Sequence, residues 1–328
     1  MIDKIIEKKK NENRGVNLRA INQQSEGRIY TPILLIDEPE LLLHPSLIGD
    51  ITEKIRKLEA NNIATIITTH SPFLLHPFIQ QEESIANLVI MQKGKGGDLK
   101  NPLYLWNFLL DSEIEKKIED EYGYFAEKKD ENIKDPDFYI SKWKRLFNQE
   151  TLRVFFAKKV LFVEGITDYL LFNNILKEKL QKELKGVEII PIFGKFHYIF
   201  FYELAKWLEL DYWFLLDEDK YKEQDGKEHW KEPHGKDIHK VFWEKYGENK
   251  VLVETNGIMH SKEENKIKIS WIRFDLENFL GIKDKSAEDK EYNLISRAKT
   301  VLETLEDNSA KLNELRKIFT NFLEVNKK

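Results

Sequence analysis

The sequence predicts an α/β protein with two parts, each containing a parallel β-sheet. Short continuous apolar runs, of the kind found in strands buried on both faces, alternate with segments whose apolar residues recur at helical spacing. This alternation occurs in residues 33–68 and again in residues 159–217. In both places acidic residues follow the apolar runs, at the edge of the sheet where α/β proteins place their ligands.

The composition permits two domains and limits the kinds of site they can hold. The 328 residues are 41% hydrophobic and include no cysteine. A disulfide framework and a cysteine-ligated zinc site are therefore excluded, and a reducing cytoplasm is the expected compartment. The N-terminus has no apolar signal region, and no apolar run approaches the roughly 18 residues that a membrane-spanning helix needs. With a net charge of −5, any binding of nucleic acid would require a local basic surface.

The first part begins with a polar segment and continues as a βαβ unit. Residues 1–30 are broken by glycines, which predicts a short helix and a loop rather than a domain. The run "ILLID" then predicts a strand, and "SLIGDITEKIRKLEA" predicts a helix capped by Ser46. The run "IATIITTHS" predicts a second strand, parallel to the first because a helix connects them.

A hairpin and a helical connector precede the second part. The segment "NLVIMQKGKGGDLKNPLYLW" predicts a hairpin, because two apolar runs flank its glycine-rich turn. Residues 106–155 place charged and aromatic side chains at helical spacing, interrupted by Pro136. Strands and helices then alternate as "KKVLFVEG", residues 167–185, "VEIIPIFG", "YIFFYELAKWLE" and "YWFLLDED". We expect a second parallel sheet, followed by a charged loop and a lysine-rich helical tail.

Two adjacent carboxylates end the first predicted strand, and a histidine ends the second. These residues are Asp37, Glu38 and His70. In a nucleotide hydrolase a strand-end Asp holds Mg²⁺ through water, the next Glu polarises the attacking water, and a nearby His hydrogen-bonds the γ-phosphate. The alternative for the acids alone is that they cap the following helix. The histidine at the neighbouring strand end favours a nucleotide site.

The loop that should hold the phosphates of a nucleotide does not occur in this sequence. Such a loop reads G-x-x-x-x-G-K-[ST], so that backbone N–H groups and a lysine surround the phosphates. "KGKGG" at residues 93–97 is too short, and it follows the acidic strand instead of preceding it. We therefore expect no autonomous ATP hydrolysis, and ATP binding without this loop is doubtful. Three interpretations stay open: a truncated or split gene, a half completed by another chain, and a degenerate half retained for dimerisation.

A second group of acids lies at the strand ends of the second part. Glu164 and Asp168 stand four residues apart at a helix start. Asp217 and Asp219 stand two residues apart at the end of the third strand, where the alternation of side chains directs both to the same side. Hard oxygen ligands of this kind suit Mg²⁺ or Mn²⁺, and two ions roughly 3.5–4 Å apart can stabilise both oxygens of a phosphodiester displacement. The alternative for the first pair is a helix N-terminus that attracts acids.

These segments resemble parts of known families. "LLIDEPELLLHP" and "TTHSPFLL" resemble the Walker B, D-loop and switch-histidine segments of ABC-type ATPases, in the variant of the OLD (overcoming lysogenisation defect) nucleases, and "NQQSEGRI" loosely resembles the signature loop. Residues 156–280 resemble a Toprim domain. The resemblance implies an α/β chain with a partial ABC-type ATPase domain (1–105), a helical connector (106–155), and a Toprim-like parallel-sheet nuclease domain with a helical C-terminal extension (156–328).

The Toprim resemblance also implies roles for single residues. The metal ligands implied are Glu164, Asp168, Asp217, Asp219 and, from "RFDLENFL", Glu277, which could instead be a first-turn helix acid. Lys195 lies near the Gly-Gly-Lys position of the family and would contact phosphate, although Phe193 replaces the first glycine. The C-terminal catalytic lysine of the family has four candidates, namely Lys283, Lys285, Lys290 and Lys299. The histidines His229, His234 and His239 match no metal-binding spacing and are expected in a surface loop.

The combination of the two parts predicts a metal-dependent DNA endonuclease that uses two Mg²⁺ or Mn²⁺ ions. The resemblance implies a homodimer through residues 1–105 and a role in defence against phage or foreign DNA. A separate chain that supplies the phosphate-binding loop is a further expected partner. A Toprim primase or topoisomerase is an alternative, against which stands the lack of a cysteine zinc ribbon. Two further alternatives are a non-catalytic regulatory or assembly partner of a complete ABC-type ATPase chain, and an inactive fragment of a longer gene.

Overall fold

The chain forms two compact units in this computed structural model. The first comprises Met1–Ala86 with Phe147–Leu152, and the second comprises Asn87–Leu146 with Arg153–Lys328. The structure describes residues 33–41, 43–61, 63–80, 88–93, 97–125, 143–222, 227–230, 243, 251–255, 258–261, 268–272, 276–280, 299–300 and 309–324. Within these residues no helix is long and apolar enough to cross a membrane.

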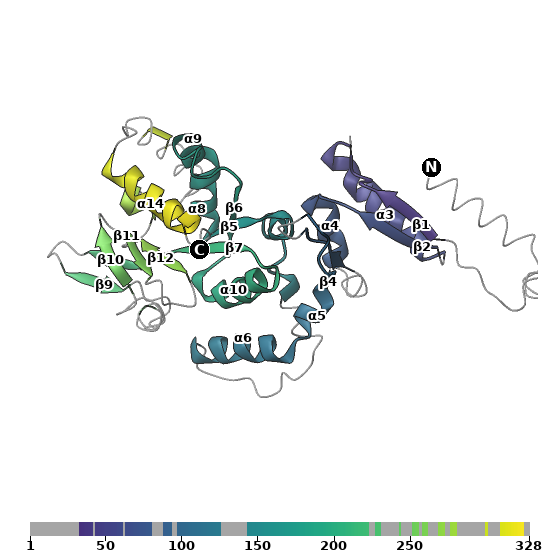
Figure 1. The fold of residues 1–328 in the computed structure, drawn as a ribbon, viewed down its shortest axis with the longest axis horizontal. Coiled ribbons are helices and arrows are strands. Elements are labelled where there is room, and N and C mark those ends of the chain that lie inside the picture. The colour runs from purple at the N-terminus through teal and green to yellow at the C-terminus, as the bar shows by residue number, and fades with distance from the viewer. Residues whose placement is uncertain are drawn as a thin grey trace, which may run out of the picture. The chain divides into compact units, whose positions relative to one another are not determined.

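The first unit contains the predicted βαβ arrangement (Figure 1). Strand β1 (Ile33–Asp37) pairs in parallel with β2 (Ala64–Thr68). The connection contains a 3₁₀ turn, η1 (Pro45–Leu47), and helix α3 (Ile48–Glu59). Helix α4 (Pro72–Ile79) follows β2. The predicted signature-like loop, Asn22–Ile29, lies outside the described residues.

Side chains alternate across the two strands, so the prediction that β1 is buried on both faces is wrong. Leu34 and Ile36 pack against Leu58 and Ile63 on the helix side. On the other side Ile33, Leu35 and Ile66 are 65%, 71% and 57% exposed. The physical reason is the two-residue period of a strand, because α3 covers one face and the opposite face has no packed element among the described residues.

The predicted helix cap in the first unit is also wrong. The 3₁₀ turn delays the start of α3, so that Leu47 occupies the N-cap position without a side-chain hydrogen bond. The hydroxyl of Ser46 instead lies 2.9 Å from Nδ1 of His44. Ser71 does act as a cap, because its Oγ accepts a hydrogen bond from the Leu74 N–H at the start of α4.

The second unit begins with the predicted hairpin and a pair of helices. Strands β3 (Val89–Ile90) and β4 (Leu103–Tyr104) pair in the antiparallel direction. Helix α5 (Leu105–Leu109) continues directly from β4, and α6 (Ser112–Phe125) follows it. Both helices fall in the segment predicted to be helical, whereas Pro136 lies outside the described residues.

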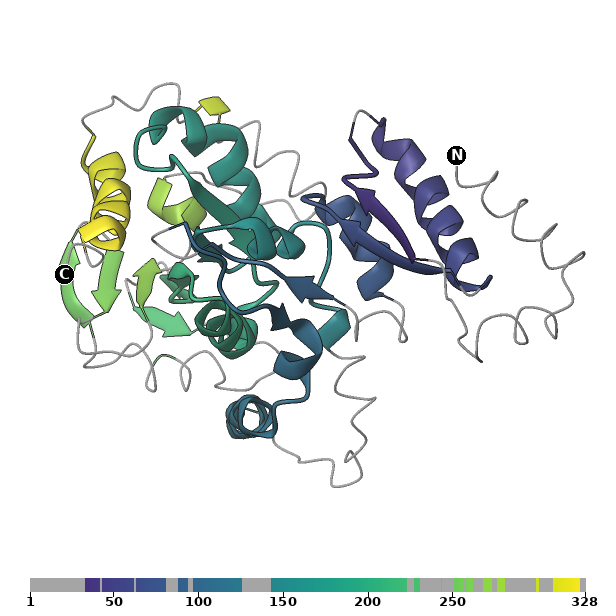
Figure 2. The same ribbon diagram turned by 45° about the vertical axis from the view of Figure 1, so that its right-hand side comes forward.

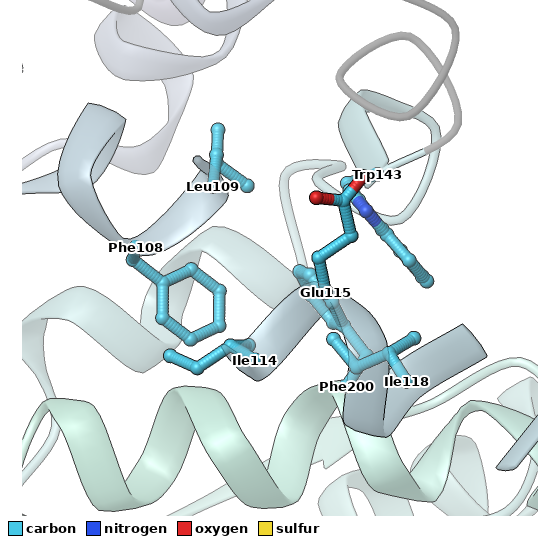
Figure 3. A pocket seen from close by; sticks show the side chains of 7 residues that line it. All are labelled: Phe108, Leu109, Ile114, Glu115, Ile118, Trp143 and Phe200. Atoms are coloured by element: carbon cyan, nitrogen blue, oxygen red, sulfur yellow. The ribbon is translucent and has the colours of Figure 1, made fainter. Parts of the chain in front are cut away.

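Aromatic side chains attach this pair of helices to helix α10 (Tyr198–Trp207). Trp143 stacks on Phe200 of α10 with ring centroids 4.9 Å apart, and Phe108 contacts the same ring at 5.8 Å. A hollow between α5, α6 and α10 has about 10 Å³ of free space, enough for roughly one water molecule. Figure 3 shows the largely apolar side chains that line it. Such a hollow is a packing defect and not a nucleotide or nucleic-acid site.

A six-stranded mixed sheet forms the centre of the second unit, in the order β10-β11-β12-β7-β5-β6. The strands are β5 (Lys159–Val163), β6 (Val187–Pro191), β7 (Asp211–Asp217), β10 (Val251–Thr255), β11 (Ile258–Ser261) and β12 (Ile269–Ile272). The three predicted strands β5, β6 and β7 are parallel, and β12, which was not predicted to join them, is parallel to β7. The two remaining strands are antiparallel and extend one edge.

Helices cover both faces of this sheet (Figure 1 and Figure 2). Residues 166–179 form α8 (Ile166–Leu171), a π-helical turn η4 (Phe172–Leu176) and α9 (Lys177–Lys179), and they share one apolar core with α12 (Leu276–Leu280) and α14 (Ala310–Glu324). On the opposite face, Phe162 of β5 contacts Phe201 of α10 at 5.5 Å. Strand β5 is therefore buried on both faces, in contrast to β1.

Candidate active site

The carboxyl ends of β5, β6 and β7 meet at one edge of the sheet. Val163 at the end of β5 lies opposite Pro191 of β6 and Leu215 of β7. Because the strands are parallel, the residues that follow them share this edge. Glu164 follows β5 immediately, and Asp217 is the last residue of β7. The structure therefore brings together residues that the sequence separates by more than 50 positions.

The segment after β6 is hydrogen-bonded to the end of β5. The Ile192 N–H donates to the Val163 carbonyl oxygen and the Gly194 N–H donates to the Glu164 carbonyl oxygen, both at 2.9 Å. Gly194 has a φ of +117°, which side chains with a Cβ rarely adopt. A short 3₁₀ turn, η5 (Lys195–His197), follows and begins with the lysine.

Lys195 is buried at the centre of this edge, with a side-chain exposure of 1%. Its Nζ donates a hydrogen bond to the Asp217 carbonyl oxygen at 2.6 Å and lies 3.6 Å from Oε2 of Glu164. It also forms an ion pair with Asp219. The carboxylates of Glu164 and Asp219 and the main-chain carbonyl oxygen of Asp217 thus contact one cation, which is a side chain of the same chain.

The charges around Lys195 decide its protonation. Burial alone would lower the pKa of the Lys195 ammonium. The negative charges of Glu164 and Asp219, with a smaller effect of Asp217, outweigh burial and raise this pKa above its usual value. Lys195 is therefore a full positive charge at neutral pH, and it compensates the acids around it.

The acids at the end of β7 make different contacts. The Asp217 N–H donates a hydrogen bond to Glu164 Oε2 at 3.1 Å, which links the end of β7 to the residue that follows β5. Asp219 has a φ of +60°, a left-handed conformation that Asp tolerates better than most residues. Between them Glu218, which the sequence analysis did not single out, is buried and pairs with Lys220 at 2.6 Å. The sequence signal that could have indicated Glu218 is its position between Asp217 and Asp219, because neighbouring side chains in a strand alternate between the two faces.

Asp168 and Glu277 are placed on helices. The Oδ2 atom of Asp168 accepts a hydrogen bond from the Gly165 N–H at 2.9 Å, so this carboxylate caps the first turn of α8. That contact corresponds to the alternative interpretation for an acid at a helix start. Glu277 lies in α12, between the buried Leu276 and Phe279, and its side chain is outside what the structure describes.

The acids of the first unit are assembled separately. Thr68 donates a hydrogen bond from its hydroxyl to Asp37, its partner in the parallel register. The Glu38 N–H donates to the Thr68 carbonyl oxygen at 3.0 Å. His70 Nε2 lies 3.6 Å from Glu38 Oε1, and the two side chains are 82% and 36% exposed. The predicted proximity of Glu38 and His70 is present, at a surface open to solvent.

Two threonines and one acid of this surface were missed by the sequence analysis. Thr69 donates its hydroxyl hydrogen bond to Glu40, just as Thr68 donates to Asp37. The pairing of Thr68 with Asp37 follows from the register, since residues at the ends of adjacent parallel strands stand side by side. The "TTH" sequence before Ser71 was the available signal.

Other candidates are outside the site or outside the described residues. His229 lies exposed in β9 (Glu228–Trp230). Lys299 is exposed, and the segments that carry His234, His239, Lys283, Lys285 and Lys290 lie outside the described residues.

Comparisons with known families agree with the two groups of strand-end residues, one in each unit. The family described as "Overcoming lysogenization defect protein-like, TOPRIM domain" matches residues 155–219. The chain contains an OLD-like Toprim domain. An ATPase part precedes it, because residues 18–76 match "AAA domain, putative AbiEii toxin, Type IV TA system". The Toprim match covers β5, β6 and β7 with the residues that contact Lys195.

Two curated proteins are distantly related to this chain. Old nuclease of Escherichia phage P2 is 28% identical over 173 residues, which are 52% of this chain and 23% of that protein. Endonuclease GajA of Bacillus cereus (strain HuB5-5) is 23% identical over 210 residues, 61% of this chain and 28% of that protein. The similar region therefore spans about a quarter of the length of either relative.

The Toprim domain contains carboxylates, which are ligands for divalent cations, but these carboxylates face the ammonium group of Lys195. Among the described residues no three His, Asp or Glu side chains are grouped so that they could hold a metal ion. The oxygens of Glu164, Asp217 and Asp219 converge instead on Lys195 Nζ. Mg²⁺ and Mn²⁺ prefer oxygen ligands of the kind that here surround the Lys195 ammonium.

Replacement of Gly194 tests how strongly the Toprim domain depends on the loop that carries Lys195. A Cβ at Gly194 would meet nothing within 4 Å, so Gly194→Ala introduces no clash and only backbone strain. We expect a loss of about 1–3 kcal/mol in the free energy of unfolding of the Toprim domain, measured by urea denaturation. Gly49→Ala, in helix α3 and equally free of contacts, should stabilise its unit by about 0.5–1 kcal/mol. An unchanged free energy of unfolding in Gly194→Ala would contradict the expected backbone strain.

Proposed function

We propose that this chain is a metal-dependent DNA endonuclease that hydrolyses phosphodiester bonds in its Toprim domain. The observation that supports this most strongly is the pairing of the Glu164 and Asp219 carboxylates with one buried cation, which also donates to the Asp217 carbonyl oxygen, at the ends of adjacent parallel strands. Acids without a counterion would repel one another, so their collection here indicates a cation site. The names of the two relatives, Old nuclease and Endonuclease GajA, support a nuclease.

The proposed roles follow the positions of the acids. Glu164 and Asp168 contribute to one ion, and Asp217 and Asp219 help to hold a second, with Glu277 as the remaining ligand. When bound, Mg²⁺ or Mn²⁺ would activate water and stabilise the attacking and leaving oxygens of the phosphodiester. Glu164 is positioned for its role because the Asp217 N–H fixes Oε2 against β7. The cap at Gly165 holds Asp168 on the first turn of α8.

We propose that the ATPase part acts in assembly rather than in autonomous hydrolysis. Asp37, Glu38 and His70 are arranged at two adjacent strand ends, which supports a nucleotide-facing surface. The phosphate-binding loop that would complete such a site does not occur in this sequence. The proposed arrangement is pairing through residues 1–105, with a second copy of the chain or with a separate chain that supplies this loop. Defence against phage or foreign DNA is the proposed setting, by analogy with OLD nucleases.

Nicking of supercoiled plasmid tests the nuclease. We expect the purified chain to cleave plasmid with Mg²⁺ or Mn²⁺ in the absence of nucleotide, and Asp217→Ala to remove this cleavage because the acid at the end of β7 is lost. Asp211→Asn is the matched control, since Asp211 lies at the opposite end of the same strand. Cleavage that persists in Asp217→Ala would place the activity elsewhere.

A non-catalytic partner protein is the second candidate function. The observation that favours it is the Lys195 ammonium, which compensates the acids without any metal ion. In that case the purified chain would bind Mg²⁺ or Mn²⁺ without cleaving plasmid, and it would bind a complete ATPase chain. Absence of cleavage under both metals, with binding of metal retained, would favour this function over the endonuclease.

A further inference from the structure

Lys195 occupies the position where a metal nuclease needs its cation. Its ammonium is 1% exposed and lies between Asp219, Oε2 of Glu164 at 3.6 Å and the Asp217 carbonyl oxygen at 2.6 Å. The side chains of Glu164 and Asp219 are themselves only 17% and 13% exposed. A buried charge must be paired, and here the lysine and the two carboxylates satisfy one another.

An ammonium and a divalent ion cannot both occupy this position. Each ion of the proposed pair would need a carboxylate that now faces the ammonium, Glu164 for one and Asp219 for the other, and cations at this separation in a mostly buried site would repel each other strongly. A metal ion therefore binds only where the lysine has withdrawn. The apparent affinity for metal is then reduced, because only the fraction of molecules in which Lys195 has left the acids can bind the metal ion.

We propose that Lys195 is the built-in counterion of the acidic cluster and that a divalent metal ion binds by displacing its ammonium from Glu164 and Asp219. The proposal rests on the proposed metal-dependent function and adds a competitor to it. Lys195 thereby becomes a determinant of metal affinity, because the acids remain compensated and ordered before any metal binds.

The structure allows this exchange without unfolding of the loop. The backbone on either side of Gly194 is held to β5 by the hydrogen bonds of Ile192 and Gly194. The flexible four-carbon stem of a lysine can move its ammonium by rotation about side-chain bonds while the backbone stays in place. The exchange is therefore a change of one side chain and not of the fold.

Titration of the metal-free protein with Mn²⁺, followed by isothermal calorimetry, tests the competition. We expect Lys195→Met to bind Mn²⁺ at least about tenfold more tightly than the wild-type chain, because the competing charge is gone. Lys100→Met is the matched control, since Lys100 pairs at the surface with the exposed Glu209, outside the acidic cluster, and its loss should leave the affinity unchanged. Equal or weaker binding by Lys195→Met would overturn the proposal and would make Lys195 a support of the metal site.

A measurement on the wild-type chain covers the case in which Lys195→Met does not fold. Reductive methylation with formaldehyde, followed by peptide mass spectrometry, reports the accessibility of each lysine. Lys195 should be protected in the metal-free chain, where its amine is buried and paired. We expect saturating Mg²⁺ to raise its methylation at least about tenfold as the amine is released. Unchanged methylation in the metal-bound chain would overturn the proposal.

The outcomes separate this inference from the proposed function. If the wild-type chain binds Mn²⁺ and cleaves DNA while Lys195→Met shows unchanged affinity, the competition is wrong and the nuclease stands. If neither the wild-type chain nor a folded Lys195→Met variant binds Mn²⁺, the metal-dependent function fails and the competition fails with it.

Discussion

Glu164→Gln should reduce metal-dependent DNA cleavage by on the order of 10³-fold while leaving the Toprim domain folded. Glu164 follows the central strand β5, and its Oε2 accepts the Asp217 N–H at 3.1 Å. Glutamine keeps the shape and an acceptor oxygen for that hydrogen bond, but it removes the negative charge that binds a cation. The initial rate of plasmid nicking with Mn²⁺, at equal protein concentration, measures the loss.

Glu188→Gln provides the control for this variant. Glu188 lies on the neighbouring strand β6 and pairs with Arg153 at 2.6 Å, with both side chains partly exposed. Its replacement should change the cleavage rate by less than about twofold, because partly exposed ion pairs contribute little. A Glu164→Gln variant that cleaves as fast as Glu188→Gln would show that the carboxylate at the end of β5 is not part of the catalytic site.

Lys195→Ala should lower the free energy of unfolding of the metal-free Toprim domain by about 3–5 kcal/mol. The change removes the cation from between Glu164 and Asp219 and leaves two mostly buried carboxylates to repel each other. Urea denaturation in the presence of a chelator measures this cost. Lys100→Ala, which removes a partly exposed lysine paired with the exposed Glu209, should cost less than about 1 kcal/mol. A cost for Lys195→Ala as small as that of the control would contradict the pairing.

The pH dependence of this stability has a definite sign. The folded-state pKa of Lys195 is raised above the usual 10.5, so the folded chain holds this proton more tightly than the unfolded chain does. The contribution of the ion pair is therefore fully present below the unfolded pKa, which includes neutral pH. It is lost only as the pH rises through the folded-state pKa. The Lys195→Ala variant should accordingly differ most from the wild-type chain at neutral pH.

The regular elements were largely predictable, because they depend on local periodicity. The strands that carry Glu164 and Asp217 begin and end within a few residues of the predicted runs. The prediction failed for burial in the first unit, where Ile33 and Leu35 are exposed although their run is as apolar as that of β5. An apolar run specifies a strand, whereas its burial on a second face depends on which other elements pack there.

The proximity of three predicted acids was predictable from the sequence, whereas their contacts were not. Spacing at strand ends indicated Glu164, Asp217 and Asp219, because parallel strands bring such residues to one edge. The ion pair of Lys195 with Asp219 joins residues from different loops, and no local pattern indicates which cation the acids face. The capping role of Asp168 was one of two interpretations, and the hydrogen bond from Gly165 shows that this contact is made.

The sequence by itself determined the order of strands and helices along the chain and the acids at the strand ends. These properties follow from residue type and spacing, which are local. Only the tertiary structure decided that a lysine after β6 fills the space between acids that follow β5 and β7. The physical reason is that charges pair by distance and burial, and both are set by the packing of strands far apart in the chain.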